Sequence, residues 1–225
     1  PRHGLWSGAV TELSAVLKRI RAARPRERPR PGERCEVCAE LIPEDHDHVV
    51  DLDNRALLCA CRPCWLVFSP QGSGGRRFRA VPDRYLAFPG TSLGGGWDQL
   101  DIPVGVAFFF LNSTTEQLAA FYPSPAGATE SLLSLDAWTG IIEANPQLAT
   151  LQPDVEAVLI RTEEAARADG SGPECFIVPI DVCYELVGEM RRVWRGFDGG
   201  TEAHVVLRAF FDRIRGRSSE AAVAP

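Results

Sequence analysis

The sequence predicts an α+β protein in which a small zinc-ribbon-like module with four cysteines is followed by a mixed α+β body with antiparallel strands. Two C-x-x-C pairs near the beginning of the chain predict the module, because cysteines at this spacing hold metal ions in small ribbons. In the body, the expected strands come in hairpins and the strongest helices follow them, which favours α+β over a βαβ array. With 225 residues, the chain is long enough to bury a sizeable core.

Residues 1–32 are expected to form an amphipathic helix and a basic, proline-rich linker. Apolar side chains recur at three- and four-residue steps through residues 5–23, which is the period of one helix face. Proline lacks an amide donor, so Pro25, Pro29 and Pro31 end this helix. The segment 18–34 has eight basic and two acidic residues, a charge of +6, but no aromatic residue on which a base would stack. A solvated linker is therefore expected.

The cysteine spacing predicts a metal-binding ribbon over residues 33–90. Cys35 and Cys38 form the first pair, 22 residues follow, and Cys61 and Cys64 form the second pair. Each pair places two sulfurs on a tight turn, and two such turns form the tetrahedral sulfur cage that Zn²⁺ prefers. A ribbon of this size has little core of its own, so the metal is expected to supply much of its folding free energy.

Alternatives stay open at this metal site. Four thiolates also suit a single iron or an iron–sulfur cluster, or another metal in transit. Ala39 and Trp65 follow the two pairs, where rubredoxin-like turns usually carry glycine, and this weakens the case for iron. The fifth cysteine of the region, Cys59, either replaces Cys61 as a ligand or remains beside the site as a reactive thiol.

His46 and His48 are two residues apart, so on a strand their imidazoles share one face. Three interpretations are open: an exposed polar hairpin tip, a transient second metal site formed with a carboxylate, or the replacement of one cysteine ligand by a histidine. The hairpin itself is predicted by apolar residues at 49–50 and 57–58 around a turn at Asp53 and Asn54.

The body is expected over residues 91–217, after a strand at 76–81 and a glycine-rich connection at 89–96. Apolar runs predict strands, and the polar stretches between them predict loops; the strands are 104–111, 117–122, 155–160 and 175–180, and the loops include 123–130 and 163–173. Helices are expected from Asp136 and Asp181, each acting as an N-cap, and from Thr201.

The remaining cysteines and the end of the chain are assigned structural roles. Cys175 and Cys183 are expected in the core of the body, because one lies in an apolar strand and the other on an apolar helix face. Residues 218–225 are expected to form a disordered tail.

Composition and motifs restrict the functional classes. No apolar run is long enough for a membrane span, and the first six residues lack the pattern of a signal peptide. Residues 35–225 carry a net charge of −12, which is unlike a dedicated nucleic-acid binder. Clustered cysteines without a secretion signal favour a metal site in the reducing cytoplasm over disulfides. No hydrolase, metalloprotease or nucleotide-binding motif is present, so no catalytic residue is assigned.

Five stretches of the chain resemble an uncharacterised bacterial family: CEVCAELIPEDHDHVVDLDNRALLCACRPC, IPVGVAFFF, FYPSPAGATESLL, ANPQLATLQPDVEAVLI and PIDVCYELVG. The cysteine block and FYPSPAGATESL are the most distinctive. The resemblance extends over residues 35–210. Genes of that family often lie beside those for [NiFe]-hydrogenase subunits and maturation factors, which implies a hydrogenase-linked accessory protein by analogy. The family has no established catalytic residues, so the resemblance implies a pathway and no site.

Together these observations predict a non-enzymatic, cytoplasmic, metal-binding accessory protein. Its expected partner is a hydrogenase subunit or a maturation factor. The first alternative is an electron-transfer protein with iron at the same cysteines, which visible absorption would distinguish from a colourless zinc protein. The second alternative is nucleic-acid binding through the ribbon and linker, which predicts salt-sensitive binding.

Overall fold

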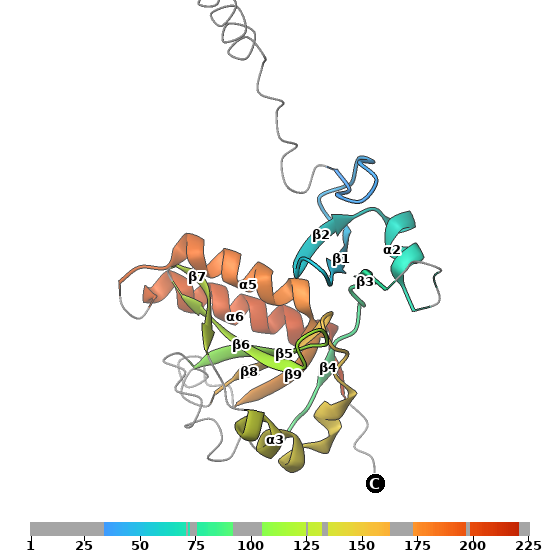
Figure 1. The fold of residues 1–225 in the computed structure, drawn as a ribbon. Helices are drawn as coiled ribbons and strands as arrows, with labels where there is room; N and C mark the ends of the chain where they lie inside the picture. Colours follow the sequence, from blue (N-terminus) through green and yellow to red (C-terminus); the bar gives the residue numbers. More distant parts are fainter. Residues whose placement is uncertain are drawn as a thin grey trace, which may run out of the picture.

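The computed structural model describes residues 34–70, 72, 76–91, 105–124, 126–131, 135–162, 173–196 and 199–220. The helix expected at 5–23, the linker after it, and nearly all of the loop 163–173 lie outside these residues, as do residues 92–96 of the glycine-rich connection. The described residues form a three-stranded sheet in the ribbon and a seven-stranded sheet in the body (Figure 1). No helix in the described part of the chain is both long and apolar enough to cross a membrane.

The ribbon, residues 34–81, is built on an antiparallel sheet in the order β2-β1-β3. Its strands are β1 (Asp47–Asp51), β2 (Ala56–Ala60) and β3 (Phe78–Ala80), and the short helix α2 (Arg62–Phe68) follows β2. The expected turn at Asp53 and Asn54 joins β1 to β2, because the amides of both residues donate to Oδ1 of Asp51.

The register of β1 and β2 gives the ribbon two different faces. Val49 lies opposite Leu58, and both pack with the cysteines and α2. Val50 lies opposite Leu57, and both pack against the body, where they meet Ile180. Successive side chains of a strand point to opposite faces, so one hairpin supplies both the core of the ribbon and the surface that docks on the body.

The body is organised around a sheet in the order β10-β4-β9-β8-β5-β6-β7. All of its strand pairs are antiparallel except β10 with β4. In chain order the strands are β4 (Leu86–Ala87), β5 (Val106–Asn112), β6 (Gln117–Ser124), β7 (Gly127–Ser131), β8 (Glu156–Arg161), β9 (Glu174–Pro179) and β10 (Ser219–Glu220).

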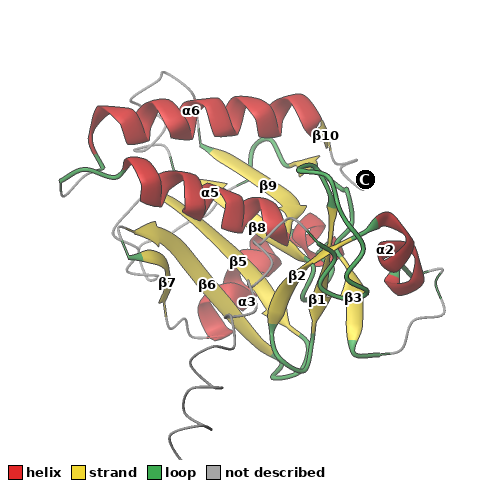
Figure 2. Ribbon diagram, turned by 90° about the horizontal axis from the view of Figure 1, so that it is seen from above, coloured by secondary structure: helices red, strands yellow, loops and turns green. Residues whose placement is uncertain are grey.

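Helices cover both faces of this sheet (Figure 2). Helices α5 (Ile180–Val193) and α6 (Gly200–Arg217) pack on the face that carries Leu159 and Phe176. Helix α3 (Leu135–Ala144) and the 3₁₀ segment η3 (Pro146–Thr150) lie on the opposite side, where Leu148 packs on Val158 and Ile177. Because both faces are covered, all six residues of β8 are buried.

The predicted fold class is confirmed, and so is the hairpin of β5 and β6 around residues 113–116. The loop expected at 123–130 is wrong, because β6 continues to Ser124 and β7 begins at Gly127. Strand β6 pairs with β5 only as far as Phe121. Beyond Phe121, no residue of β5 pairs with β6, so that edge of β6 needs no amide donor. Pro123, which lacks an amide N–H, is therefore tolerated there.

Smaller expectations also differ from the structure. Asp181 is not the N-cap of α5; Pro179 holds that position, and Asp181 lies in the first turn. Asp136 likewise lies inside α3, which begins at Leu135. Residues 219–220, in the expected disordered tail, form β10 beside β4. Cys175 and Cys183 are both buried in the body, as expected.

Candidate metal centre

The cysteines of the two C-x-x-C pairs converge. The Sγ atoms of this four-cysteine cluster all lie within 4.8 Å of one another; its members are Cys35, Cys38, Cys61 and Cys64. The sulfurs of Cys38 and Cys61 are 3.6 Å apart, far longer than the ~2.05 Å of a disulfide. A tetrahedral zinc ion with Zn–S bonds of ~2.3 Å separates its sulfurs by about 3.8 Å. The donor set and its spacing therefore fit one four-coordinate ion.

A tight turn shapes the first pair. The amide of Cys35 donates to the carbonyl of Glu40 at 2.7 Å, and the amide of Ala39 donates to the carbonyl of Cys35 at 2.8 Å. Ala39 has a φ of 66°, in the left-handed region that favours glycine. The position after Cys38 thus has the backbone of a glycine-bearing metal turn although its residue is alanine.

The second pair lies where β2 passes into α2. Cys61 is the N-cap of α2, with extended φ and ψ of −74° and 157°, and Pro63 stands in the first turn. The amide of Trp65 donates to the carbonyl of Cys61 at 3.0 Å. The amide of Cys64 donates to the Cys61 sulfur, so the beginning of the helix orients the thiol of Cys61.

The thiols differ in exposure and in acidity. Cys35 and Cys61 are buried, Cys64 is half-buried and Cys38 is exposed. Burial opposes ionisation of Cys35, but hydrogen bonds from the amides of Cys61, Cys38 and Val37 outweigh it and lower the pKa of Cys35 to about 6. These amide donors favour the thiolate form of Cys35.

The second pair ionises less readily. The amide of Cys64 favours the thiolate of Cys61, but burial and the neighbouring sulfurs outweigh it and raise the pKa of Cys61. Burial, followed by the sulfurs of Cys38, Cys61 and Cys35, raises the pKa of Cys64 well above its usual range. A divalent cation offsets this repulsion between thiolates, so metal binding by the cluster is expected to release protons.

Cys59 belongs to a different group of potential ligands. It lies opposite His48 in the register of β1 and β2. One ligand atom from each of His46, His48 and Cys59 falls within 4.8 Å of the others, and we call these three residues the His–His–Cys cluster. Strand β2 ends at Ala60, so Cys61 leaves the strand alternation and joins the four-cysteine cluster.

Sequence reasoning missed the pairing of Cys59 with His48 and the contact of His48 with Asp181. The first had a signal in the sequence, because a hairpin folded about Asp53 and Asn54 brings residues 48 and 59 opposite each other. The second had none, because Nδ1 of His48 meets Oδ2 of Asp181 at 2.8 Å across 133 positions of sequence.

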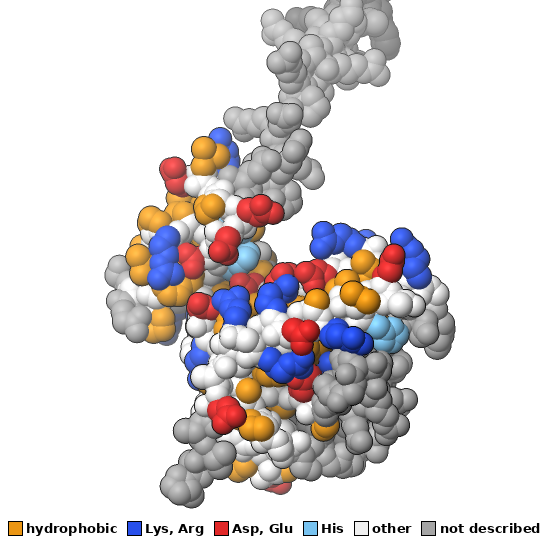
Figure 3. Space-filling model, turned by 180° about the vertical axis from the view of Figure 1, so that it is seen from behind, with side chains coloured by type: hydrophobic (Ala, Val, Ile, Leu, Met, Phe, Trp, Pro, Cys, Tyr) orange, Lys and Arg blue, Asp and Glu red, His pale blue; other side chains and the backbone are white. Residues whose placement is uncertain are grey.

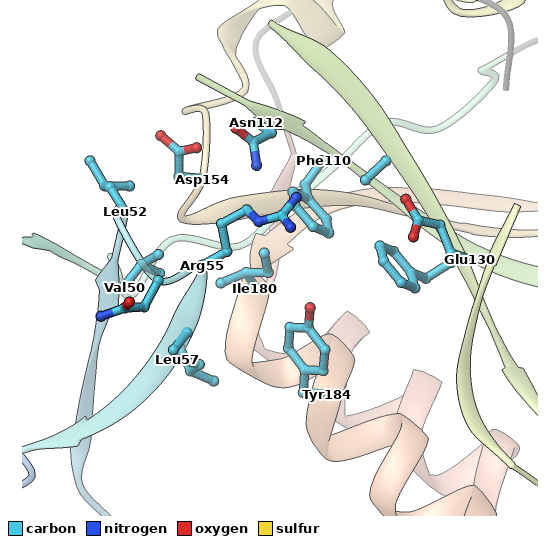
Figure 4. Close-up of a pocket in the computed structure, with 14 residues that line it drawn as sticks. Val50, Leu52, Arg55, Leu57, Phe110, Asn112, Glu130, Asp154, Ile180 and Tyr184 are labelled. Atoms are coloured by element: carbon cyan, nitrogen blue, oxygen red, sulfur yellow. The ribbon is translucent and has the colours of Figure 1, made fainter. Parts of the chain in front are cut away.

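A cleft of about 310 Å³ separates part of the ribbon from the body. Its wall is mostly apolar, and Figure 4 shows Arg55 extended across the cleft toward Phe110 with the Tyr184 hydroxyl directed into the same space. At its rim, Asp154 accepts hydrogen bonds from Arg79 at 2.9 Å and from the Ser113 hydroxyl at 2.6 Å. No cysteine or histidine is among the described residues that line this cleft, so it is separate from both clusters.

The comparisons with known proteins identify a family but no activity. A family of unknown function, DUF5947, matches residues 34–218. This range contains the four-cysteine cluster and the His–His–Cys cluster. No curated protein and no solved structure matches the chain.

Proposed function

The chain belongs to DUF5947, a family of unknown function, and from its four-cysteine cluster we propose that it is a non-enzymatic, metal-binding accessory protein. The observation that carries this proposal is the convergence of four sulfurs from two turns of the ribbon within 4.8 Å. Such a cluster ties the loop before β1 to the beginning of α2. The ion would therefore hold the ribbon in the shape in which it meets a partner.

Zinc is the metal that we propose for the four-cysteine cluster. All four ligands come from the protein, which is typical of a closed structural site with no position for a substrate. The buried core of the ribbon is small, and Val49, Ala60 and Ala80 are its buried non-cysteine members. A metal ion supplies the folding free energy that so small a core lacks. Four reduced thiols also fit the reducing cytoplasm that we propose as the location.

A protein partner is proposed for the ribbon. Three of its large apolar side chains are well exposed: Leu41 at 65%, Leu66 at 51% and Val67 at 44%. Figure 3 shows hydrophobic side chains over the outer surface of the ribbon. The gene surroundings of the resembling family support a [NiFe]-hydrogenase subunit or a maturation factor as this partner.

Elemental analysis of protein purified without a tag under anaerobic conditions tests the metal. We expect zinc bound to the four-cysteine cluster, lost on Cys38→Ser and kept on Glu40→Gln, a control at an exposed position of the same turn. Stoichiometric iron with visible absorption, lost on Cys38→Ser, would replace the proposal with the electron-transfer alternative. No metal at these cysteines would refute both.

Binding to purified hydrogenase subunits and maturation factors tests the partner. We expect one of them to bind the wild type and to bind the double variant Leu66→Asp, Val67→Asp at least tenfold more weakly. Each introduced carboxylate must be desolvated in the interface, which weakens binding. Unchanged affinity of the double variant would exclude this part of the ribbon as the docking surface.

A further inference from the structure

The His–His–Cys cluster lies on the face of the ribbon that docks on the body. Within β1, His48 shares a face with Val50, which packs against Ile180 of the body. Cys59 lies opposite His48 in β2. His46 precedes β1 by one residue, and its ring centroid is 4.8 Å from that of His48. The three side chains therefore converge at the junction of ribbon and body, on the face of the hairpin opposite the core that Val49 forms with Cys35 and Cys61.

His46 is held in the tautomer that binds metal ions. Its Nδ1 lies 2.9 Å from the carbonyl oxygen of Pro43 and 3.0 Å from that of Glu44. A carbonyl oxygen only accepts, so Nδ1 carries the hydrogen and Nε2 has the free lone pair. That Nε2 is buried and has no hydrogen-bond partner among the described residues. A buried acceptor without a partner requires an explanation, and a metal ion in the cluster is one.

His48 is oriented in the same way by the body. Its Nδ1 is 2.8 Å from Oδ2 of Asp181, and the other oxygen, Oδ1, accepts from the amide of Val182 at 2.8 Å. The carboxylate is therefore fixed at the beginning of α5 and directs the imidazole. Histidines that ligate metals characteristically donate their second ring nitrogen to a carboxylate or a backbone carbonyl. His46 has the carbonyl partner and His48 has the carboxylate partner.

The surroundings attract cations. His46 and His48 line a groove of about 680 Å³ between ribbon and body. Its other described lining residues include two arginines, Arg62 and Arg217, and six carboxylates, Glu44, Asp45, Asp47, Asp83, Asp181 and Glu185. Figure 3 shows acidic side chains gathered beside a histidine at this hollow. The carboxylates outnumber the arginines, so the groove carries a net negative charge that raises the local concentration of cations beside His46 and His48.

We propose that His46, His48 and Cys59 form a second metal site, which takes a borderline-soft divalent transition-metal ion such as Zn²⁺. Two imidazoles and one thiolate suit zinc and its neighbours and not Mg²⁺ or Ca²⁺. Three protein ligands leave one coordination position open, so this ion is exchangeable, in contrast to the closed four-cysteine cluster. Because Asp181 belongs to the body, ion binding also couples the ribbon to the body.

Zinc titration of the intact chain tests the site. The chain is stripped of metal under anaerobic, reducing conditions and titrated with Zn²⁺ alone. We expect two ions per wild-type chain, and one ion per chain for His46→Ala, for Cys59→Ala and for His48→Gln, whose amide still donates to Asp181 but does not ligate. The matched control His204→Ala, on an exposed histidine of α6, is expected to bind two.

A second measurement separates a ligand role from a folding role. In the Co²⁺-loaded chain, Asp181→Asn is expected to keep the cobalt–thiolate absorption of the site while weakening its affinity ~10–100-fold. Far-ultraviolet circular dichroism checks that each variant is folded. Zinc stoichiometry equal to that of the wild type in folded His46→Ala and Cys59→Ala would overturn the proposal.

Cys59→Ala separates the two metal sites, because it is expected to lose only the ion of the His–His–Cys cluster and to keep the ion of the four-cysteine cluster. Cys38→Ser is expected to lose both ions, because the ribbon that carries His46, His48 and Cys59 unfolds without its structural ion. Zinc binding that Cys59→Ala abolishes and Cys38→Ser leaves unchanged would refute the proposed function and support the second site. Zinc binding that Cys38→Ser abolishes and Cys59→Ala leaves unchanged would refute the second site and support the proposed function.

Discussion

Replacing Cys38 by serine tests how far the ribbon stabilises the body. Cys38 is the exposed member of the four-cysteine cluster, so the change removes a metal ligand and little packing. Without the ion, the whole ribbon, residues 34–81, is expected to unfold, because its small core does not offset its conformational entropy. The question is then what the body loses when the ribbon no longer covers it.

The expected loss of stability of the body follows from the side chains that it buries against the ribbon. Val155 and Ile180 of the body are 0% and 4% exposed and pack with Val50 and Val81 of the ribbon. Fully burying such a side chain contributes ~1.5–3 kcal/mol. Each of the two also contacts the body, so about half of this is lost for each, ~1.5–3 kcal/mol together. For a body of roughly 130 residues, 1 kcal/mol shifts the Tm by ~3–4 °C, so we expect a decrease of ~5–12 °C.

Hydrogen exchange measures the unfolding of the ribbon, and thermal unfolding measures the loss of stability of the body. We expect Cys38→Ser to remove amide protection from the ribbon and to leave one cooperative transition of the body at the lower Tm. Glu40→Gln is the control and should change neither. A body Tm equal to that of the wild type would refute the contribution assigned to Val155 and Ile180. Full protection of the ribbon in the metal-free variant would refute the role of the ion in its folding.

Three further changes test individual features of the fold. Ala39→Gly is expected to raise the free energy of unfolding in urea by ~0.5–1 kcal/mol, because glycine adopts the φ of 66° without strain; a decrease would contradict this. Arg84→Ala should lower the free energy of unfolding by ~3–5 kcal/mol, because the fully buried Glu156 carboxylate loses its bidentate partner. Additive effects of Arg84→Ala and Glu156→Gln in a double-mutant cycle would contradict an interaction between the two side chains. The hydrogen bond from Arg77 lowers the pKa of Asp51, so the stability from this carboxylate is present above about pH 4 and is lost as the pH falls toward the folded-state pKa. Urea midpoints between about pH 5 and pH 2 should therefore fall more steeply in the wild type than in Asp51→Asn, and equal slopes would exclude this role of Asp51.

Local patterns in the sequence predicted much of the ribbon and of the sheet in the body. The spacing of the two C-x-x-C pairs identified the four cysteines that converge, because each pair spans one tight turn whose geometry the intervening residues fix. Apolar runs located β5, β8 and β9, since strands covered on both faces are apolar along most of their length. The local pattern was misleading at residues 123–130. Proline and glycine predicted a loop there, but Pro123 and Gly127 lie in the paired strands β6 and β7 at the end of the sheet.

The sequence by itself determined that four cysteines meet, because each C-x-x-C pair spans one tight turn and turns act over a few residues. The hairpin pattern also carried a signal for the pairing of His48 with Cys59, which sequence reasoning missed. Only the tertiary structure decided the rest of the candidate sites. It separated Cys59 from Cys61 by ending β2 at Ala60. It also changed the expected role of Asp181 from a helix cap to a partner of His48. That contact depends on how two independently patterned surfaces dock, and no short-range pattern encodes the relative position of residues 133 apart in the sequence.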